Sequence, residues 1–424
     1  MIDKLIQLVR KGFASIQDHR SSNASYPLVD ILSSGFAMFS LKDPSLLIFR
    51  KQYARRSENL ERVYGIKKLP EDTALREGLD GVKPSALDAQ FSIPLEELRS
   101  QGILDNRLVL GGYTAISCDA TGHYCSGKKQ CPHCMVKNLR NGEQRFYHQL
   151  LAAVMTHPDQ KTVFPVACEA IVKQDGSTKN DCELNASKRL IPKIRSMLPN
   201  DKLLLIFDAL YANGPHIKLL KQYQISFISG IKEGYVVIQK EQLAKEGKLQ
   251  VRTWHQFNKT CTIRYTNELI LNGQHQDLRV NYFEYEEIDN RTKKQTFFSS
   301  WITDIPITEE NCKELVAVAR CRWKIENETF NTLKNQGYHL EHNYGHGKQY
   351  LATNFALLTM LAFLVDQIAQ HLDKAFQKAW EKVETKKLLW IEVNQAFNLL
   401  PVMSMNVIYR FICGDIKINI PLLE

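Results

Sequence analysis

The sequence predicts an α/β protein in which a mixed β-sheet is flanked by helices, with a β-rich insertion and helical regions at both ends of the chain. Three observations predict this fold class. Apolar residues recur at helical spacing in residues 1–108 and again after residue 349. Short β-forming runs alternate with helical runs in residues 109–234, the order expected of a sheet covered by helices. Residues 235–307 contain short alternating runs typical of antiparallel strands, and a helical segment follows them.

Length and composition are those of an ordinary globular protein. The chain has 424 residues, enough for about two or three domains, and hydrophobic and charged residues make up 44% and 24% of it. These values exclude a disordered, collagen-like or coiled-coil chain. Lys and Arg total 55 against 46 Asp and Glu, a net charge of +9 that suggests a polyanionic partner. Residues 1–105 hold 15 of the basic and 14 of the acidic residues, so the excess lies downstream.

No segment predicts membrane insertion or export. The longest apolar run, residues 355–365, is shorter than the roughly 18–20 residues of a membrane span, and it ends at Asp366. We therefore expect a buried helix there and no membrane partner. The first residues lack an uninterrupted apolar stretch and a small-residue cleavage site, so we expect a cytoplasmic protein. In that compartment the ten cysteines are expected to be thiols or metal ligands rather than disulfides.

The expected elements of the remaining chain follow in order from residue 113. They are a strand at 113–119, a loop at 121–144, strands at 146–155 and 162–171, a helix at 182–198, a strand at 202–208, a helix starting at 213–215, a strand at 225–231, the β-rich insertion, and helices at 308–335, 350–371 and 374–400. The second and third strands join at a turn and are expected to pair as a hairpin. Asn180 or Asp181 is expected to cap the helix that follows, and Thr308 the first helix after the insertion. A hairpin followed by a strand–helix–strand unit makes the sheet mixed.

Two aspartates follow apolar strands of the predicted sheet. Asp119 ends the first strand and Asp208 ends a continuous apolar one, and ligands gather at the carboxyl ends of strands in open α/β sheets. Glu326, on a later helix with Arg322 at i, i+4, is the best candidate for a third acid. Three carboxylates would hold Mg²⁺ or Mn²⁺ for phosphoryl chemistry. Each residue alone is more commonly a turn, cap or surface ion-pair residue, and it is their combination in this order that favours a metal site. The side chains expected to dock this helix on the sheet are Trp323, Ile325, Phe330 and Leu333.

These motifs together resemble the DDE transposases of bacterial insertion sequences, whose catalytic domain has an RNase H-like fold. In this resemblance Asp119, in Ser-Cys-Asp-Ala, is the first catalytic aspartate. Asp208, in Ile-Phe-Asp-Ala-Leu-Tyr-Ala, is the second, and Glu326, in Arg-Trp-Lys-Ile-Glu-Asn, is the third acid. The β-rich insertion before the last acid is similar to that of one particular group within these enzymes.

That group carries a Y-x2-R-x3-E-x6-K signature on its last catalytic helix. Arg322 and Glu326 fit the signature, whereas Ala319 and Leu333 stand at its tyrosine and lysine positions, and Lys334 lies one residue late. Lys334 therefore does not match the signature, and the resemblance supports a role for it less directly than for the acids.

The resemblance implies a division of the chain and a set of activities. Residues 1–108 would form a helical DNA-binding region, 109–234 with 308–348 the RNase H-like catalytic domain, 235–307 the insertion, and 349–424 a C-terminal helical region. The enzyme would cleave DNA at transposon ends and transfer the strands to a target, in a cut-and-paste reaction. Its partners would be double-stranded terminal inverted repeats and target DNA, bound by a homodimer in the bacterial cytoplasm and on the nucleoid.

The same resemblance implies the ligands and the DNA contacts. Asp119, Asp208 and Glu326 would hold the Mg²⁺ or Mn²⁺, and Arg322 and Lys334 would contact DNA. Two alternatives remain: a metal-dependent DNA nuclease of the same fold, and a domesticated transposase that acts as a DNA-binding protein. The retained acids argue against the domesticated protein. The long insertion, which a minimal nuclease does not need, argues against the nuclease.

The cysteine-rich segment at 121–144 predicts a second kind of site. It contains a CxxC pair, a common spacing of zinc ligands, and thiolates bind zinc strongly. The alternative is that these thiols carry no metal. The candidate ligands of a structural Zn²⁺ are Cys125, Cys131, Cys134 and His148, with His123 as the alternative to His148.

Other polar residues receive simpler interpretations. The basic side chains of this segment are expected to bind DNA phosphates beside Asp119, and Lys128, Lys129 and Arg140 are the candidates. Three later histidines are expected to be solvated or to face DNA rather than to bind metal; they are His339, His342 and His346. Glu183 is left outside the catalytic set, because an acid in the first turn of a helix is explained by the helix dipole.

Overall fold

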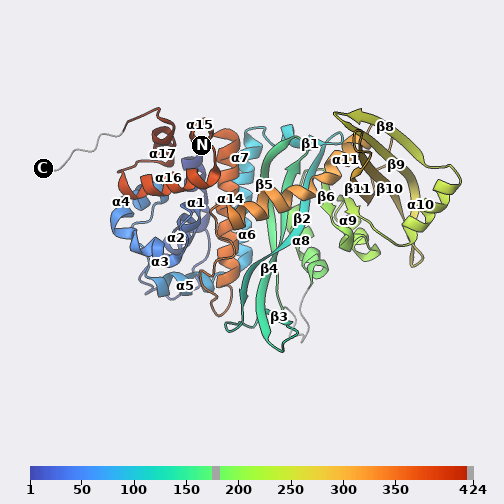
Figure 1. Ribbon diagram of the computed structural model, residues 1–424. Helices are drawn as coiled ribbons and strands as arrows, with labels where there is room; N and C mark the ends of the chain where they lie inside the picture. Colours follow the sequence, from blue (N-terminus) through green and yellow to red (C-terminus); the bar gives the residue numbers. More distant parts are fainter. Residues whose placement is uncertain (174–181, 418–424) are drawn as a thin grey trace.

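The computed structural model describes residues 1–173 and 182–417. A central sheet lies between a helical lobe, drawn in blue and red, and the β-rich insertion, drawn in yellow and brown (Figure 1). The predicted capping residues Asn180 and Asp181 lie outside the described residues.

One mixed sheet holds the eleven strands found among the described residues, and the predicted α/β class is confirmed. The strands are β1 (Leu108–Val109), β2 (Tyr113–Ser126), β3 (Met135–Asn138), β4 (Gln144–His157), β5 (Gln160–Ile171), β6 (Leu203–Phe207), β7 (Ser226–Gly230), β8 (Gln250–Gln256), β9 (Lys259–Asn272), β10 (His275–Asp289) and β11 (Gln295–Thr303). The predicted hairpin is β4–β5, which pairs in antiparallel fashion.

Five strands form the centre of this sheet, in the spatial order β5-β4-β2-β6-β7. β2 pairs antiparallel with β4 and parallel with β6, and β6 pairs parallel with β7. The whole of β6 is apolar and buried, as expected of a parallel strand covered on both faces. α8 (Glu183–Met197) precedes β6, and α9 (Gly214–Gln222), capped by Asn213, makes the crossover to β7 that a parallel pair requires. This arrangement agrees with the predicted RNase H-like fold.

The insertion continues the central sheet. β11 pairs antiparallel with β7, with Trp301 opposite Gly230, and β10, β9 and β8 follow outward. The insertion opens with a helix, α10 (Tyr235–Lys245), where only strands were expected. Its first residues, Tyr-Val-Val-Ile, favour strands locally, but the following Gln-Lys-Glu-Gln-Leu-Ala-Lys run consists of strong helix formers, and these decide the structure.

The helices at the two ends of the chain pack together as one helical lobe. Its N-terminal members are α1 (Ile2–Ala14), α2 (Leu28–Ser40), α3 (Leu46–Lys51), α4 (Tyr53–Tyr64), α5 (Asp72–Asp80), α6 (Pro84–Asp88) and α7 (Ser92–Ser100). Its C-terminal members are α14 (Leu351–Leu372), α15 (Lys374–Val383), α16 (Lys386–Leu399) and α17 (Met405–Cys413). α14 contacts helices of both groups and also β4 and β5, so it joins the lobe to the sheet.

α14 is the expected buried helix. By length and composition it could cross a membrane, but the whole of its most apolar 18-residue window is buried inside the protein. Two other helices differ from the sequence prediction. The helix expected at 374–400 is two helices, because Glu384 takes a positive φ of 67° and Thr385 caps α16.

The helix expected at 308–335 is interrupted. Its parts are α11 (Cys312–Arg320), α12 (Arg322–Lys324), a π-helical segment (Ile325–Asn331) and α13 (Thr332–Asn335). The Thr308 hydroxyl accepts a hydrogen bond from the Asn311 N–H at 3.3 Å, although the regular helix begins only at Cys312. π-helical turns are uncommon and often mark functional positions.

The segment expected as a loop at 121–144 is largely β structure. β2 continues to Ser126, since it pairs with β4 as far as Ser126 opposite Phe146, and β3 adds a further strand. Pairing with a long neighbouring strand overrides the local glycine and lysine content, a tertiary effect that sequence periodicity does not record.

A buried polar contact ties the helical lobe to the chain that follows the interrupted helix. The Lys42 ammonium pairs with the Asp366 carboxylate, and each side chain is only 3% exposed. The Tyr338 hydroxyl donates to the same carboxylate at 2.6 Å, and the Trp390 ring lies 4.0 Å from the Lys42 nitrogen. Burial lowers the pKa of Lys42 and raises that of Asp366, so each charge depends on the other for its compensation.

Lys42→Met should therefore destabilise the protein strongly. It leaves the Asp366 carboxylate buried without its cation, a change that typically costs about 3–5 kcal/mol. The shift of the urea unfolding midpoint, followed by circular dichroism, measures the loss. Lys248→Met, at a side chain that is 66% exposed, is the matched control and should leave the midpoint nearly unchanged. Equal midpoints for the two variants would contradict the assigned role of Lys42.

Candidate active site

The parallel pairing of β2 with β6 positions the two predicted aspartates. Ser117 lies opposite Ile206 in this pair, and two residues further along each strand lie Asp119 and Asp208. The register thus places the aspartates side by side on strands about 4.8 Å apart. Asp208 follows its strand as predicted, whereas Asp119 lies inside β2, which continues past it.

Local hydrogen bonds orient both carboxylates. An oxygen of Asp119 accepts from the Ala120 N–H at 2.9 Å, and one of Asp208 accepts from the Leu210 N–H at 2.9 Å. The latter bond caps the short 3₁₀ turn Ala209–Tyr211 that follows β6. Each aspartate therefore keeps oxygen lone pairs free for a cation while its backbone fixes its direction.

Arg322 connects the third predicted acid to the first. Its guanidinium lies 2.7 Å from a Glu326 oxygen, at the expected i, i+4 spacing, and 3.1 Å from an Asp119 oxygen. Glu326 lies in the π-helical segment and is about half exposed. In the part of the chain that the structure describes, Asp119, Asp208 and Glu326 do not form a group with all ligand atoms within 4.8 Å, and Arg322 lies between two of them.

The electrostatics of the site are those of acids crowded in a partly buried place. Burial raises the pKa of Asp119 to about 6, opposed by Arg322 and assisted by the neighbouring Glu326 carboxylate. Burial and the charge of Asp208 raise the pKa of Glu183, whose carboxylate accepts from the Tyr211 hydroxyl at 3.4 Å. Glu183 therefore lies beside Asp208, closer to the acids than its position on the helix suggested.

Comparison with known protein families supports the same assignment. Residues 112–364 match the family described as transposase DDE domain, which is more than half of the chain. The chain belongs to this family. The match includes all three acids and the whole insertion, so the predicted DDE-type transposase and its RNase H-like fold are confirmed. No curated protein matches the chain. The narrower Y-R-E-K assignment stays a prediction, because the buried Ala319 and Leu333 stand at two of its positions.

A groove in this transposase domain reaches Arg322, the residue that pairs with Asp119 and Glu326. It has a volume of about 750 Å³ and lies between the insertion and the helices α11 and α12. Among its lining residues are aromatic and basic side chains: Trp254, Tyr285, Trp301, Lys313, Arg320 and Arg322. Trp323, at the same groove, is 66% exposed, whereas Ile325, Phe330 and Leu333 are buried as predicted. The expected docking role of Trp323 is therefore wrong, and its indole is free to contact a ligand.

The basic side chains predicted to contact DNA lie farther from Asp119 than expected. Lys128, Lys129 and Arg140 are exposed, but they lie beyond the end of β2. Ser126, which ends β2, is seven residues past Asp119, about 23 Å in an extended strand. These side chains are thus not beside Asp119. Lys334 pairs with Glu341 at 2.8 Å.

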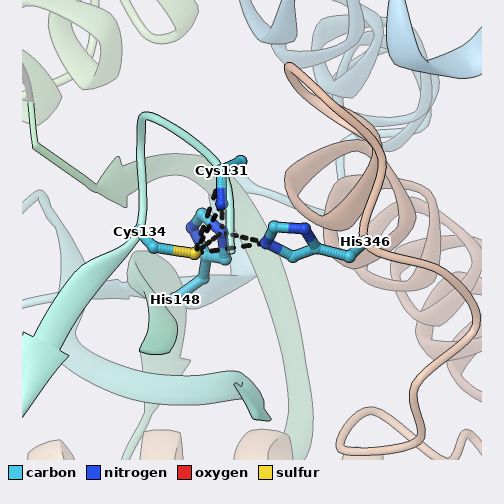
Figure 2. Close-up of side chains that lie close together, drawn as sticks. All are labelled: Cys131, Cys134, His148 and His346. Atoms are coloured by element: carbon cyan, nitrogen blue, oxygen red, sulfur yellow. Dashed lines mark hydrogen bonds between the residues drawn. The ribbon is translucent and has the colours of Figure 1, made fainter. Parts of the chain in front are cut away.

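The cysteine-rich segment forms a compact cluster with a different membership from the predicted one. Cys131, Cys134 and His148 lie together as expected, but His346 completes the group (Figure 2). Cys125 is exposed and lies outside the cluster, and so does the buried His123, which stacks on His148. Nothing in the spacing of His346 distinguished it from its neighbours, because it comes from a connection more than 200 residues downstream.

Proposed function

We propose that this transposase cleaves DNA at the ends of its transposon and transfers the strands to target DNA, with Asp119, Asp208 and Glu326 as the catalytic carboxylates. The observation that carries the proposal is the register of β2 and β6, which sets the two aspartates side by side, with Glu326 linked to Asp119 through Arg322. DNA bearing the terminal inverted repeats and the target DNA are the proposed partners of a cytoplasmic homodimer, which must hold two ends at once.

The donor set fits a divalent cation of the Mg²⁺ or Mn²⁺ type. Three carboxylates supply hard oxygen ligands, and one guanidinium partly balances their charge. When bound, such a cation polarises a phosphodiester and lowers the pKa of an attacking water or 3′-hydroxyl. Asp119, Asp208 and Glu326 would hold it. Arg322 lies between Asp119 and Glu326, and its positive charge compensates their negative charges in the absence of a cation.

The groove supplies the DNA-binding part of the proposal. Its lysine and arginine side chains match phosphate charges, and the exposed indole of Trp323 suits stacking on unpaired or partly unstacked bases at a DNA end. Arg322 lines this groove and pairs with Asp119 and Glu326, so a strand bound there is expected to bring a phosphate to the arginine that contacts two of the acids.

Replacing any one catalytic acid should abolish DNA cleavage and joining. Asp119→Asn, Asp208→Asn and Glu326→Gln are each expected to lower both rates by about 10³-fold or more, the scale of losing one member of a catalytic unit. The assay supplies Mg²⁺ or Mn²⁺ and DNA that carries the inverted repeats flanking the gene, and it resolves cleaved from strand-transfer products. Cleavage without joining by the unaltered protein would instead indicate the nuclease.

Two further variants sharpen this assay. Asp304→Asn makes the same change at a partly buried acid, which accepts from the Phe227 N–H near the start of β7, away from the strand end where Asp208 lies, and it should keep activity. Glu183→Gln tests whether the acid beside Asp208 is the third ligand. Activity retained by Glu326→Gln but lost by Glu183→Gln would replace Glu326 in the assignment.

Removing Arg322 should strengthen cation binding in the absence of DNA. Arg322→Met deletes the positive charge that competes with a metal for Asp119 and Glu326, which is worth about 1–2 kcal/mol, or roughly 5- to 30-fold in affinity. Calorimetric titration with Mn²⁺ measures the change. Arg320→Met, whose guanidinium pairs with Glu287 instead, is the control. Weaker Mn²⁺ binding by Arg322→Met would show that the guanidinium assembles the acids rather than competing for them.

Trp323→Ala should weaken DNA-end binding without unfolding the protein. Stacking of one base on an aromatic ring is worth about 1–3 kcal/mol, and the exposed indole contributes little to the core. Fluorescence anisotropy with labelled end DNA measures the dissociation constant. Phe257→Ala changes a side chain that is 98% exposed and lies outside the groove, so it controls for general loss of aromatic surface. Equal affinities for the two variants would remove Trp323 from the DNA site.

A further inference from the structure

Four side chains of types that can bind metals meet next to β3, at the edge of the sheet, and His148 among them pairs with Tyr124, five residues along β2 from Asp119. Cys131 and Cys134 come from the turn before β3, His148 from β4, and His346 from the connection between α13 and α14 (Figure 2). Cys134 and His148 are buried, and Cys131 and His346 are partly so. Segments about 200 residues apart in sequence therefore place two thiols and two imidazole nitrogens around one point.

The distances between these atoms are those of a tetrahedron. The two sulfur atoms are 3.8 Å apart, and the two Nε2 atoms are 3.2 Å apart. The sulfur of Cys134 lies 3.3 Å from Nε2 of His148 and 3.2 Å from that of His346, and the Cys131 sulfur lies 3.5 Å from Nε2 of His148. Zn–S bonds of about 2.3 Å and Zn–N bonds of about 2.05 Å at tetrahedral angles give about 3.8 Å for S to S, 3.3 Å for N to N and 3.6 Å for S to N.

Interactions other than metal binding account poorly for this arrangement. The sulfur atoms are too far apart for a disulfide, whose S–S bond is about 2.05 Å. Thiols and imidazoles form only weak hydrogen bonds with one another. Each thiol and each neutral imidazole has a single hydrogen to donate, so hydrogen bonds alone explain poorly why four such groups converge. The Cys131 N–H donates to the Cys134 sulfur at 3.4 Å, an interaction that stabilises a thiolate. The Tyr124 ring packs 4.5 Å from the His346 ring and shields it.

We propose that Cys131, Cys134, His148 and His346 bind one Zn²⁺ ion as a closed structural site. Two thiolates and two imidazoles suit zinc rather than the hard cation expected at the carboxylates. All four positions are filled by the protein, so no position is open for substrate, and the site is structural. On binding, the two thiols release their protons to solvent, and the two thiolates balance the charge of the ion.

The ion would fasten the β3–β4 edge of the sheet to the chain that leaves the interrupted helix. His346 follows Glu326 by twenty residues, and the connection between them also carries Tyr338, which the Asp366 carboxylate holds. Two independent attachments thus fix this connection, one in the helical lobe and one at the sheet. The zinc site does not depend on the proposed DNA chemistry, and it can be tested without DNA.

Metal content and Co²⁺ spectra of the purified full-length protein test the site. The unaltered protein is expected to hold about one zinc per chain by mass spectrometry. After removal of the ion, titration with Co²⁺ should give the strong visible bands of a tetrahedral ion and the near-ultraviolet bands of thiolate ligation. Removal should also lower the melting temperature, and added Zn²⁺ should restore it.

Matched variants decide the membership of the site. His346→Ala and Cys134→Ser should lose stoichiometric zinc and the tetrahedral Co²⁺ spectrum, whereas His342→Ala and Cys125→Ser, at neighbouring positions outside the cluster, should keep both. Circular dichroism shows whether each variant is folded, and the Co²⁺ spectrum of Cys131→Ser, with one thiolate fewer, reports ligation directly. Absence of zinc and of a tetrahedral Co²⁺ spectrum in the unaltered protein would overturn the proposal. Loss in Cys125→Ser together with retention in His346→Ala would overturn the assignment of His346.

Discussion

The parallel pairing of β2 with β6 is the constraint on which the rest of the molecule depends. β6 is five apolar residues long and wholly buried, so it can lie only at the centre of a covered sheet. Its register with β2 aligns Asp119 with Asp208. Since side chains alternate between the two faces of a strand, a slip by one residue would turn one aspartate to the other face. The apolar pattern that fixes the register therefore also fixes the geometry of the acids.

The surroundings of the acids follow from this placement. Because β2 continues beyond Asp119, that carboxylate is partly buried in the sheet rather than solvated at a strand end, and its pKa rises to about 6. A cation is needed nearby to keep it charged, and Arg322 provides it from α12, 203 residues downstream. The insertion enters the same neighbourhood because β11 joins β7 directly. The groove that reaches Arg322 thus depends on the continuity of the sheet, with the insertion as one wall.

The sequence predicted those helices and strands whose formation depends mainly on their own residues. The strands around Asp119 and Asp208, the hairpin β4–β5 and the buried α14 follow from runs and periodicities that each segment carries by itself. The strand extension of β2 to Ser126 and the packing of both chain ends into one lobe depend on partners distant in sequence, so no local pattern records them. The same is true of the fourth member of the cysteine cluster. Cys125 lies in the same segment as the other cysteines, but it lies outside the cluster, and His346 reaches the thiols only through the tertiary fold.

Ligand chemistry separates the two metal sites that we propose for this chain. Carboxylate oxygens at the centre of the sheet suit a labile, hydrated cation that must exchange ligands during phosphoryl transfer, and a guanidinium beside them keeps the acids compensated without it. Thiolates and imidazoles at the sheet edge suit an ion that is held by four protein ligands and exchanges slowly. Hard and soft donors discriminate against each other's metals, so a cell that contains both ions can load each site correctly. His346 follows Glu326 by twenty residues, so the zinc ion that we propose would anchor the chain that leaves the helix carrying the proposed third acid.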